Sequence, residues 1–187
     1  MIYPKKLNSR KSKIIIDILL LVTMVISAIL ILINKWTTPN ISWAYIAICG
    51  FVYFWVTLIY SLKRNTNIAA HILLHMIATS LVVLYIDKIL NFTGWSICIG
   101  IPIILMAANS TMLGLSIIDS KRYIRYAIYQ LVIVCISMAQ FVIVMNLNID
   151  FKVLNIVSVI ISILNFVISL ILSYKEFYKI IVCKFHI

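Results

Sequence analysis

The sequence predicts an all-α fold, a polytopic bundle of six transmembrane helices. Composition, the length of the apolar runs and the placement of the basic residues predict it. Of the 187 residues, 64% are hydrophobic and only 11% are charged, which lies outside the range of soluble globular domains. A helix needs about 20 mostly apolar residues to cross the bilayer. The predicted spans are 14–33, 41–62, 68–86, 96–118, 123–145 and 153–174.

The apolar runs predict helices and exclude a β-barrel. Residues 14–16 and 19–22 are apolar on every side and do not alternate with a period of two, as barrel strands would. In lipid, backbone groups have to be satisfied within the segment, which leaves the helix. Because the six spans leave no room for a soluble domain, we expect residues 1–187 to form a single integral membrane domain.

Basic residues predict the orientation of the spans. Thirteen of the 16 Lys and Arg fall before the first span, in the second and fourth gaps, or in the tail. The opposite gaps hold Lys35, Lys88 and Lys152. The positive-inside rule therefore predicts a multi-pass protein of a bacterial cell membrane with both termini in the cytoplasm. The net charge of +11 is explained by anionic headgroups, so we expect the lipid bilayer and not nucleic acid as the partner of these residues.

The chain can be divided into three helical hairpins. Ser61, Ser120 and Ser173 each precede basic residues at the end of a descending span, spaced 59 and then 53 residues apart. This pattern indicates either a parallel internal repeat or the basic residues that any descending helix needs.

Small and polar residues at helical spacing predict packing faces, because helix association in lipid uses close contact and hydrogen bonds. The sixth span has such a stripe at Asn155, Ser158, Ser162, Asn165, Ser169 and Ser173. The fourth has Gly100, Ala107, Thr111 and Gly114, and the fifth has Ala127, Gln130 and Ser137. Such faces either pack within the chain or line a polar cavity. Asn109 and Asn165 should lie near the midplane and could pair. The candidate binding residues are Asn109, Gln130, Ser158, Ser162, Asn165 and Ser169.

A second candidate site combines His71 and His75, four residues apart on the third span, with Asp17 on the first. Two histidines and a carboxylate suit a metal ion or a proton pathway. The alternative is packing with local hydrogen bonds. Pro102 is expected to kink the fourth span and help form a cavity. Asp87, next to Lys88, is expected to be a solvated or locally paired charge.

No catalytic pattern is present, so we expect no enzyme activity. Cys49, Cys98 and Cys135 fall within spans and Cys183 faces the reducing cytoplasm, so no disulfide is expected. Cys183 and His186 make half of a metal motif. The chain has only four Gly and no glycine-rich phosphate loop, so no cofactor is expected.

Short motifs carry a family resemblance: Tyr3-Pro4-Lys5, the segment from Asp87 through Gly94-Trp95-Ser96 to Ile101-Pro102-Ile103, and the close Lys184-Phe185-His186-Ile187. With the six spans, they resemble an uncharacterised family of membrane proteins from Gram-positive bacteria. Members of that family often carry an N-terminal zinc ribbon, which this chain lacks, since its first cysteine is Cys49. The resemblance implies the topology and no activity.

Taken together, these patterns favour a non-enzymatic membrane protein that acts through helix contacts with another membrane component. It could be an immunity or self-protection protein against a membrane-active peptide, or an accessory subunit of a transporter. A homo-oligomer is compatible with the same faces. The alternatives are a small transporter or substrate-binding subunit similar to those of energy-coupling-factor transporters, and a proton or metal pathway through Asp17, His71 and His75.

Overall fold

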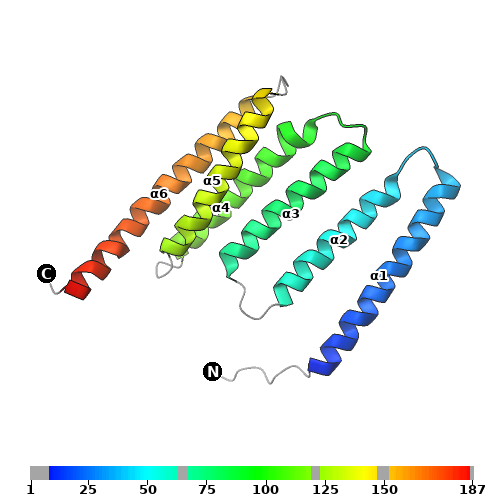
Figure 1. Cartoon of the computed structure of the whole chain (residues 1–187), viewed down its shortest axis with the longest axis horizontal. Coiled ribbons are helices and arrows are strands. Elements are labelled where there is room, and N and C mark those ends of the chain that lie inside the picture. Colours follow the sequence, from blue (N-terminus) through cyan, green and yellow to red (C-terminus); the bar gives the residue numbers. More distant parts are fainter. Residues whose placement is uncertain (1–8, 63–66, 119–122, 147–151, 186–187) are drawn as a thin grey trace. The chain divides into compact units, whose positions relative to one another are not determined.

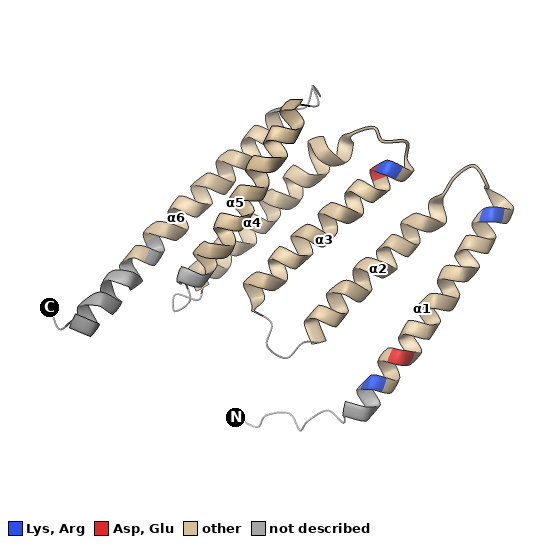
Figure 2. Ribbon diagram, viewed as in Figure 1, with Lys and Arg blue, Asp and Glu red and all other residues tan. Residues whose placement is uncertain are grey.

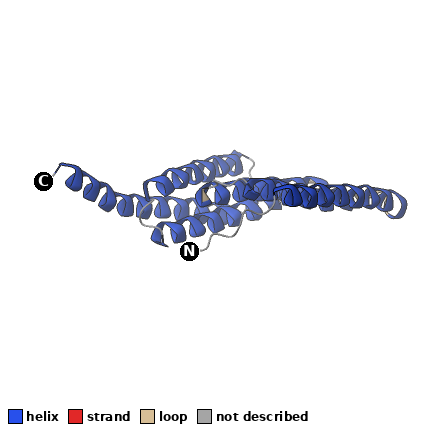
Figure 3. Cartoon of the chain, turned by 90° about the horizontal axis from the view of Figure 1, so that it is seen from below, coloured by secondary structure: helices blue, strands red, loops and turns tan. Residues whose placement is uncertain are grey.

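A computed structural model describes residues 9–62, 67–118, 123–146 and 152–185, and helices make up the regular structure of this part of the chain (Figure 3). The helices are α1 (Ser9–Thr37), α2 (Trp43–Leu62), α3 (Ile68–Ile89), the π-helical turn η1 (Ser96–Gly100), α4 (Ile101–Ile118), α5 (Tyr123–Asn146) and α6 (Lys152–Phe185) (Figure 1). Six candidate membrane spans lie within them. The predicted all-α membrane fold is therefore confirmed.

The observed helices differ from the predicted spans mainly at the outer ends of the chain. The first helix continues to Thr37, and α6 runs on to Phe185, past the predicted end at 174. Neither Gly nor Pro occurs between residues 152 and 185, so the sequence holds no residue that would stop the helix. The bilayer limits the apolar stretch and not the helix itself.

The chain forms two compact units, divided after Val52 within α2. In the first unit, Asn34 holds the turn between α1 and α2. Its side-chain nitrogen donates to the carbonyls of Thr38 at 3.0 Å and Ile41 at 2.8 Å, and its oxygen accepts from the backbone N–H of Ala44 at 2.8 Å. This buried amide satisfies three backbone groups at the helix ends, which need partners outside the helices.

In the second unit, α4, α5 and α6 pack against one another, and α3 packs against α4 and α5 (Figure 1). The core is built from Met76 of α3, Leu105 and Met112 of α4, and Tyr126 and Ile133 of α5.

The described charged residues lie toward the ends of α1 and α3, and the long middle sections of the described helices carry none (Figure 2). That pattern is what a hydrocarbon environment requires. The single domain over 1–187 and the threefold repeat stay predictions.

Candidate functional site

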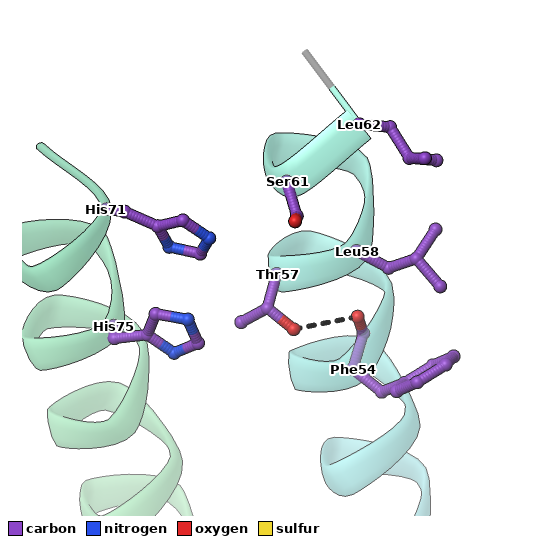
Figure 4. A pocket seen from close by; sticks show the side chains of 7 residues that line it. All are labelled: Phe54, Thr57, Leu58, Ser61, Leu62, His71 and His75. Carbon is purple, nitrogen blue, oxygen red and sulfur yellow. Dashed lines mark hydrogen bonds between the residues drawn. The ribbon is translucent and has the colours of Figure 1, made fainter. Parts of the chain in front are cut away.

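Helices α2 and α3 of the second unit form an open pocket of ≈ 350 Å³ (Figure 4). It is lined by Phe54, Thr57, Leu58, Ser61, Leu62, His71 and His75. The polar residues recur at a spacing of four on each helix, and this spacing places them on one face. Figure 4 shows Thr57 and Ser61 on the side of α2 that faces the two imidazole rings, with Phe54, Leu58 and Leu62 on its other side. The spacing of the histidines in the sequence predicts this pair but not its partners on α2.

Two tyrosines of α2 hold the imidazole rings in place. His71 and His75 are stacked, with centroids 4.7 Å apart and planes 8° from parallel. The hydroxyl of Tyr53 is hydrogen-bonded to Nδ1 of His75 at 2.8 Å, and the ring of Tyr60 meets His71 edge-on at 5.3 Å. Such edge contacts are favourable aromatic geometries. The rings are therefore oriented before any ligand arrives.

The stacked arrangement does not suit a metal ion. Parallel rings hold their nitrogen lone pairs in two separate parallel planes, so one ion could not lie in both planes without a rotation of the rings. Among the described residues, no group of three His, Cys, Asp or Glu side chains lies close enough to hold a metal. Asp17 lies on α1 of the first unit, where its side chain is exposed. The metal or proton role of Asp17, His71 and His75 stays a prediction.

The polar stripe of α6 lies inside the second unit. Asn155, Ser158 and Ser162 are 0% exposed and Ser169 is 1% exposed, while Asn165 is half-buried at the edge of the stripe. The side chain of Ser173 lies outside the described residues. Helix α6 packs on α4 and α5, so four of the six stripe residues face neighbouring helices of the same chain. The stripe was expected either to pack within the chain or to line a polar cavity, and these four residues pack within the chain.

Asn109 contacts this stripe, but not at the predicted residue. Its side-chain nitrogen donates to Oγ of Ser162 at 2.7 Å and to the carbonyl of Leu105 at 3.0 Å. Pairing with Asn165 is therefore wrong. Ser162 lies within the buried face of α6 and its short side chain admits the amide of Asn109, whereas Asn165 lies at the margin of that face.

Gln130 is fully enclosed within the second unit. It is 0% exposed, and neither its amide oxygen nor its nitrogen has a hydrogen-bond partner among the described residues. The side-chain oxygen of Asn109 is likewise buried without such a partner. Buried, unsatisfied amides are costly. Gln130 shares the buried face of α5 with Ala127 and Ser137, as predicted for that span.

The fourth span turns a different face inward from the one predicted. Ala107 and Thr111 are exposed, and the buried face carries Leu105, Asn109 and Met112. The assignment of Ala107 and Thr111 to an inward small-residue face is therefore wrong, while Gly100 of the same predicted face does lie close to Val83 of α3. Large apolar side chains fill the space between α3, α4 and α5, and the hydrogen bond of Asn109 to α6 fixes the same rotation.

Asp87 also differs from its prediction as a solvated or locally paired charge. It is 0% exposed, and its carboxylate accepts hydrogen bonds across the α3–η1 turn. The donors are the backbone N–H and hydroxyl of Thr93 at 3.0 and 3.1 Å, the N–H of Gly94 at 3.1 Å, and the N–H and hydroxyl of Ser96 at 3.4 and 2.6 Å. One sequence signal could have indicated this site: Asp87 precedes Thr93, Gly94 and Ser96 by six to nine residues. These residues stand at the start of a helix, where free N–H groups favour a negative charge.

Pro102 has no backbone N–H to donate to the carbonyls of η1. Its missing N–H would point to Cys98 in an α-helix and to Ile97 in a π-helix. Gln140 of α5 donates to the carbonyl of Ile97 at 2.7 Å, and Asn155 of α6 donates to that of Cys98 at 3.3 Å. Amides from two neighbouring helices thus bind carbonyls of η1, so this turn forms part of an interhelical joint. The kink and the cavity expected at Pro102 stay predictions.

Comparison with known protein families gives a match over nearly the whole chain. No curated protein and no solved structure matches the chain. The model of a family of unknown function, DUF6320, matches residues 3–187, which agrees with the resemblance seen in the sequence. The chain therefore belongs to this family of unknown function, DUF6320.

Proposed function

We propose that this protein is a non-enzymatic membrane protein that binds a small ligand in the pocket between α2 and α3. The observation that carries the proposal is the pair of imidazoles on the pocket wall, which Tyr53 and Tyr60 hold in fixed orientations. A volume of ≈ 350 Å³ is within the usual range of small-molecule sites, and a few oriented polar groups among apolar ones are typical of them. This corresponds to the substrate-binding alternative from the sequence.

The sequence favours a protein that contacts another membrane component, and the polar stripe on α6 was the main candidate surface for that contact. The stripe on α6 is buried against α4 and α5. A stripe that already packs within the chain is not free to receive a partner helix. An immunity or transporter-accessory role therefore stays a prediction without an assigned surface.

The charge pattern supports a cytoplasmic position for this pocket. Its residues border the gap 63–66, which carries Lys63 and Arg64 in the sequence, and gaps rich in Lys and Arg face the cytoplasm. On this proposal, both termini and the ligand pocket lie on the inner side of the cell membrane.

The proposal is tested by filling the pocket. In Thr57→Trp, the indole would occupy the space beside the imidazoles. Thr111→Trp is the matched control, because Thr111 is also a helical Thr whose hydroxyl bonds to a carbonyl of its own helix, but it lies on α4. Native mass spectrometry of protein purified in mild detergent should show one bound small molecule in the wild type and in Thr111→Trp, and none in Thr57→Trp. The same bound species in all three proteins would contradict the proposal.

A further inference from the structure

We propose that the ligand of the α2–α3 pocket is the anionic phosphate headgroup of a membrane lipid, with its acyl chains along the side of α2 that carries Phe54 and Leu62. This inference rests on the proposed function and names the chemistry of the ligand. Three features carry it: the hydrogen-bond donors in the pocket, the lack of acidic side chains in its described lining, and its depth in the membrane.

The imidazole rings are arranged to donate into the pocket. Nδ1 of His75 is hydrogen-bonded to the Tyr53 hydroxyl at 2.8 Å, so Nε2 is the nitrogen left for a ligand; we assign the proton to Nε2, the tautomer in which the phenol donates to Nδ1. Nδ1 of His71 is buried without a partner among the described residues, which again leaves Nε2 as the nitrogen that can meet a ligand. Both stacked rings, with centroids 4.7 Å apart, lie on the α3 wall of the pocket (Figure 4), so on this proposal their two Nε2–H groups meet the same ligand.

The rest of the pocket selects for an acceptor of hydrogen bonds. The residues described as its lining include no Asp or Glu, and Ser61 adds a hydroxyl at the exposed rim. The hydroxyl of Thr57 already donates to the carbonyl of Phe54 at 2.9 Å. Two N–H groups and one O–H without a negative charge nearby suit an oxyanion, because charge-assisted hydrogen bonds are about twice as strong as neutral ones.

The apolar residues and the depth of the site distinguish a lipid from a free anion. Phe54 and Leu62 are 42% and 58% exposed and lie on the side of α2 away from the histidines (Figure 4). The candidate spans end at Leu62 and begin at Ile68, so Ser61 and His71 lie within one turn of the membrane boundary. A phosphate at this height would belong to a lipid whose chains cover the apolar side of α2.

The test uses delipidated protein in detergent and native mass spectrometry titrations with three probes: dioleoyl phosphatidylglycerol, dioleoylglycerol and inorganic phosphate. We expect phosphatidylglycerol to bind at least about tenfold more tightly than dioleoylglycerol, which has the same chains without the phosphate. Inorganic phosphate should neither bind at millimolar concentration nor displace the lipid. Equal binding of the two lipids would overturn the proposal, and phosphate that binds as tightly as the lipid would show a site for the free anion.

Two variants assign the binding to the pocket. His75→Phe keeps a stacked ring but removes its N–H, and Ser61→Ala removes the rim hydroxyl. Each should weaken phosphatidylglycerol binding by about tenfold, the effect of one hydrogen bond to a charged group, and leave dioleoylglycerol unaffected. Ser110→Ala is the control, an exposed helical serine bonded to its own helix. Should His75→Phe fail to fold, Ser61→Ala alone decides, and unchanged binding would overturn the proposal.

The same measurements separate this inference from the function on which it rests. A bound molecule without phosphorus that Thr57→Trp removes would leave ligand binding in place and overturn the lipid headgroup. If Thr57→Trp removes nothing and no lipid distinguishes the variants, both proposals are wrong.

Discussion

At the scale of single residues, Asp87 is the buried charge on which the α3–η1 turn depends. Asp87→Ala removes the acceptor for three backbone N–H groups and two hydroxyls. We expect a loss of about 2–4 kcal/mol in the free energy of unfolding, since each buried donor left unsatisfied costs about 1–3 kcal/mol and water replaces part of the loss. The unfolding free energy of Asp87→Asn should fall between those of the wild type and Asp87→Ala, because one side-chain oxygen remains as an acceptor. Denaturant titration in detergent measures the difference. Lys88→Ala, at the exposed neighbour, should be near wild type, and an equal loss there would contradict the assignment.

Gly100 allows a close approach between η1 and α3. A Cβ at this position would lie 2.7 Å from Cγ1 of Val83. Gly100→Ala should therefore destabilise the protein by about 1–3 kcal/mol, the usual cost of overpacking. Gly114→Ala is the matched control, since nothing lies within 4 Å of its Cβ and Ala favours a helix by up to about 1 kcal/mol. Val83→Ala should rescue Gly100→Ala in the double variant. A Gly100→Ala protein as stable as wild type would show that α3 is not in close contact there.

At the scale of elements, Pro102 links η1 to α5 and α6 through Gln140 and Asn155. Pro102→Ala would restore a backbone N–H for a carbonyl of η1. The hydrogen bond from Gln140 to the carbonyl of Ile97 would then contribute less to stability. We expect Gln140→Leu to cost about 1–2 kcal/mol in the wild type, the cost of one buried acceptor left unpaired, and clearly less in the Pro102→Ala background. A double-mutant cycle on unfolding free energies measures this coupling, for which about 0.5–3 kcal/mol is usual between residues in contact. Strict additivity would show that the carbonyls of η1 do not depend on Gln140.

The positions of the six apolar helices were predictable because bilayer thickness sets the length of each apolar run, but the continuation of α1 and α6 beyond their apolar runs was not. The inward faces were predictable only in part. Spacing shows which residues share a face, but not which face turns inward. On α6 the polar stripe is the buried face. On α4, Leu105 and Met112 fill the core and turn Ala107 and Thr111 outward.

Asp87 and the pocket show why contacts across elements were missed. The partners of Asp87 lie across a turn in which Asn91, Phe92 and Gly94 have positive φ, and the sequence alone does not reveal so unusual a backbone path. His71 and His75 were recognised as a pair, but Tyr53 and Tyr60 had been assigned no role beside them. Their contribution depends on which side of α2 faces α3, and this becomes visible only when the helices are packed.

At the scale of the whole molecule, the placement of the basic residues predicts the orientation of the chain. A fluorescent protein fused after Ile187 should fold and fluoresce, because it would stay in the cytoplasm. Alkaline phosphatase, which needs the outer, disulfide-forming side, should be active after Thr38 and inactive after Ile187. The reason is the excess of Lys and Arg in alternate gaps, thirteen of the 16 in the chain.

Substitution of the basic residues tests this cause. Lys35→Gln should leave the difference in phosphatase activity between the Thr38 and Ile187 fusions unchanged or increase it. Replacing the five basic residues before the first span with Gln should reduce this activity difference, because the first helix usually dominates orientation. An active phosphatase after Ile187 in the wild-type chain would reverse the predicted orientation and move the α2–α3 pocket to the outer side of the membrane.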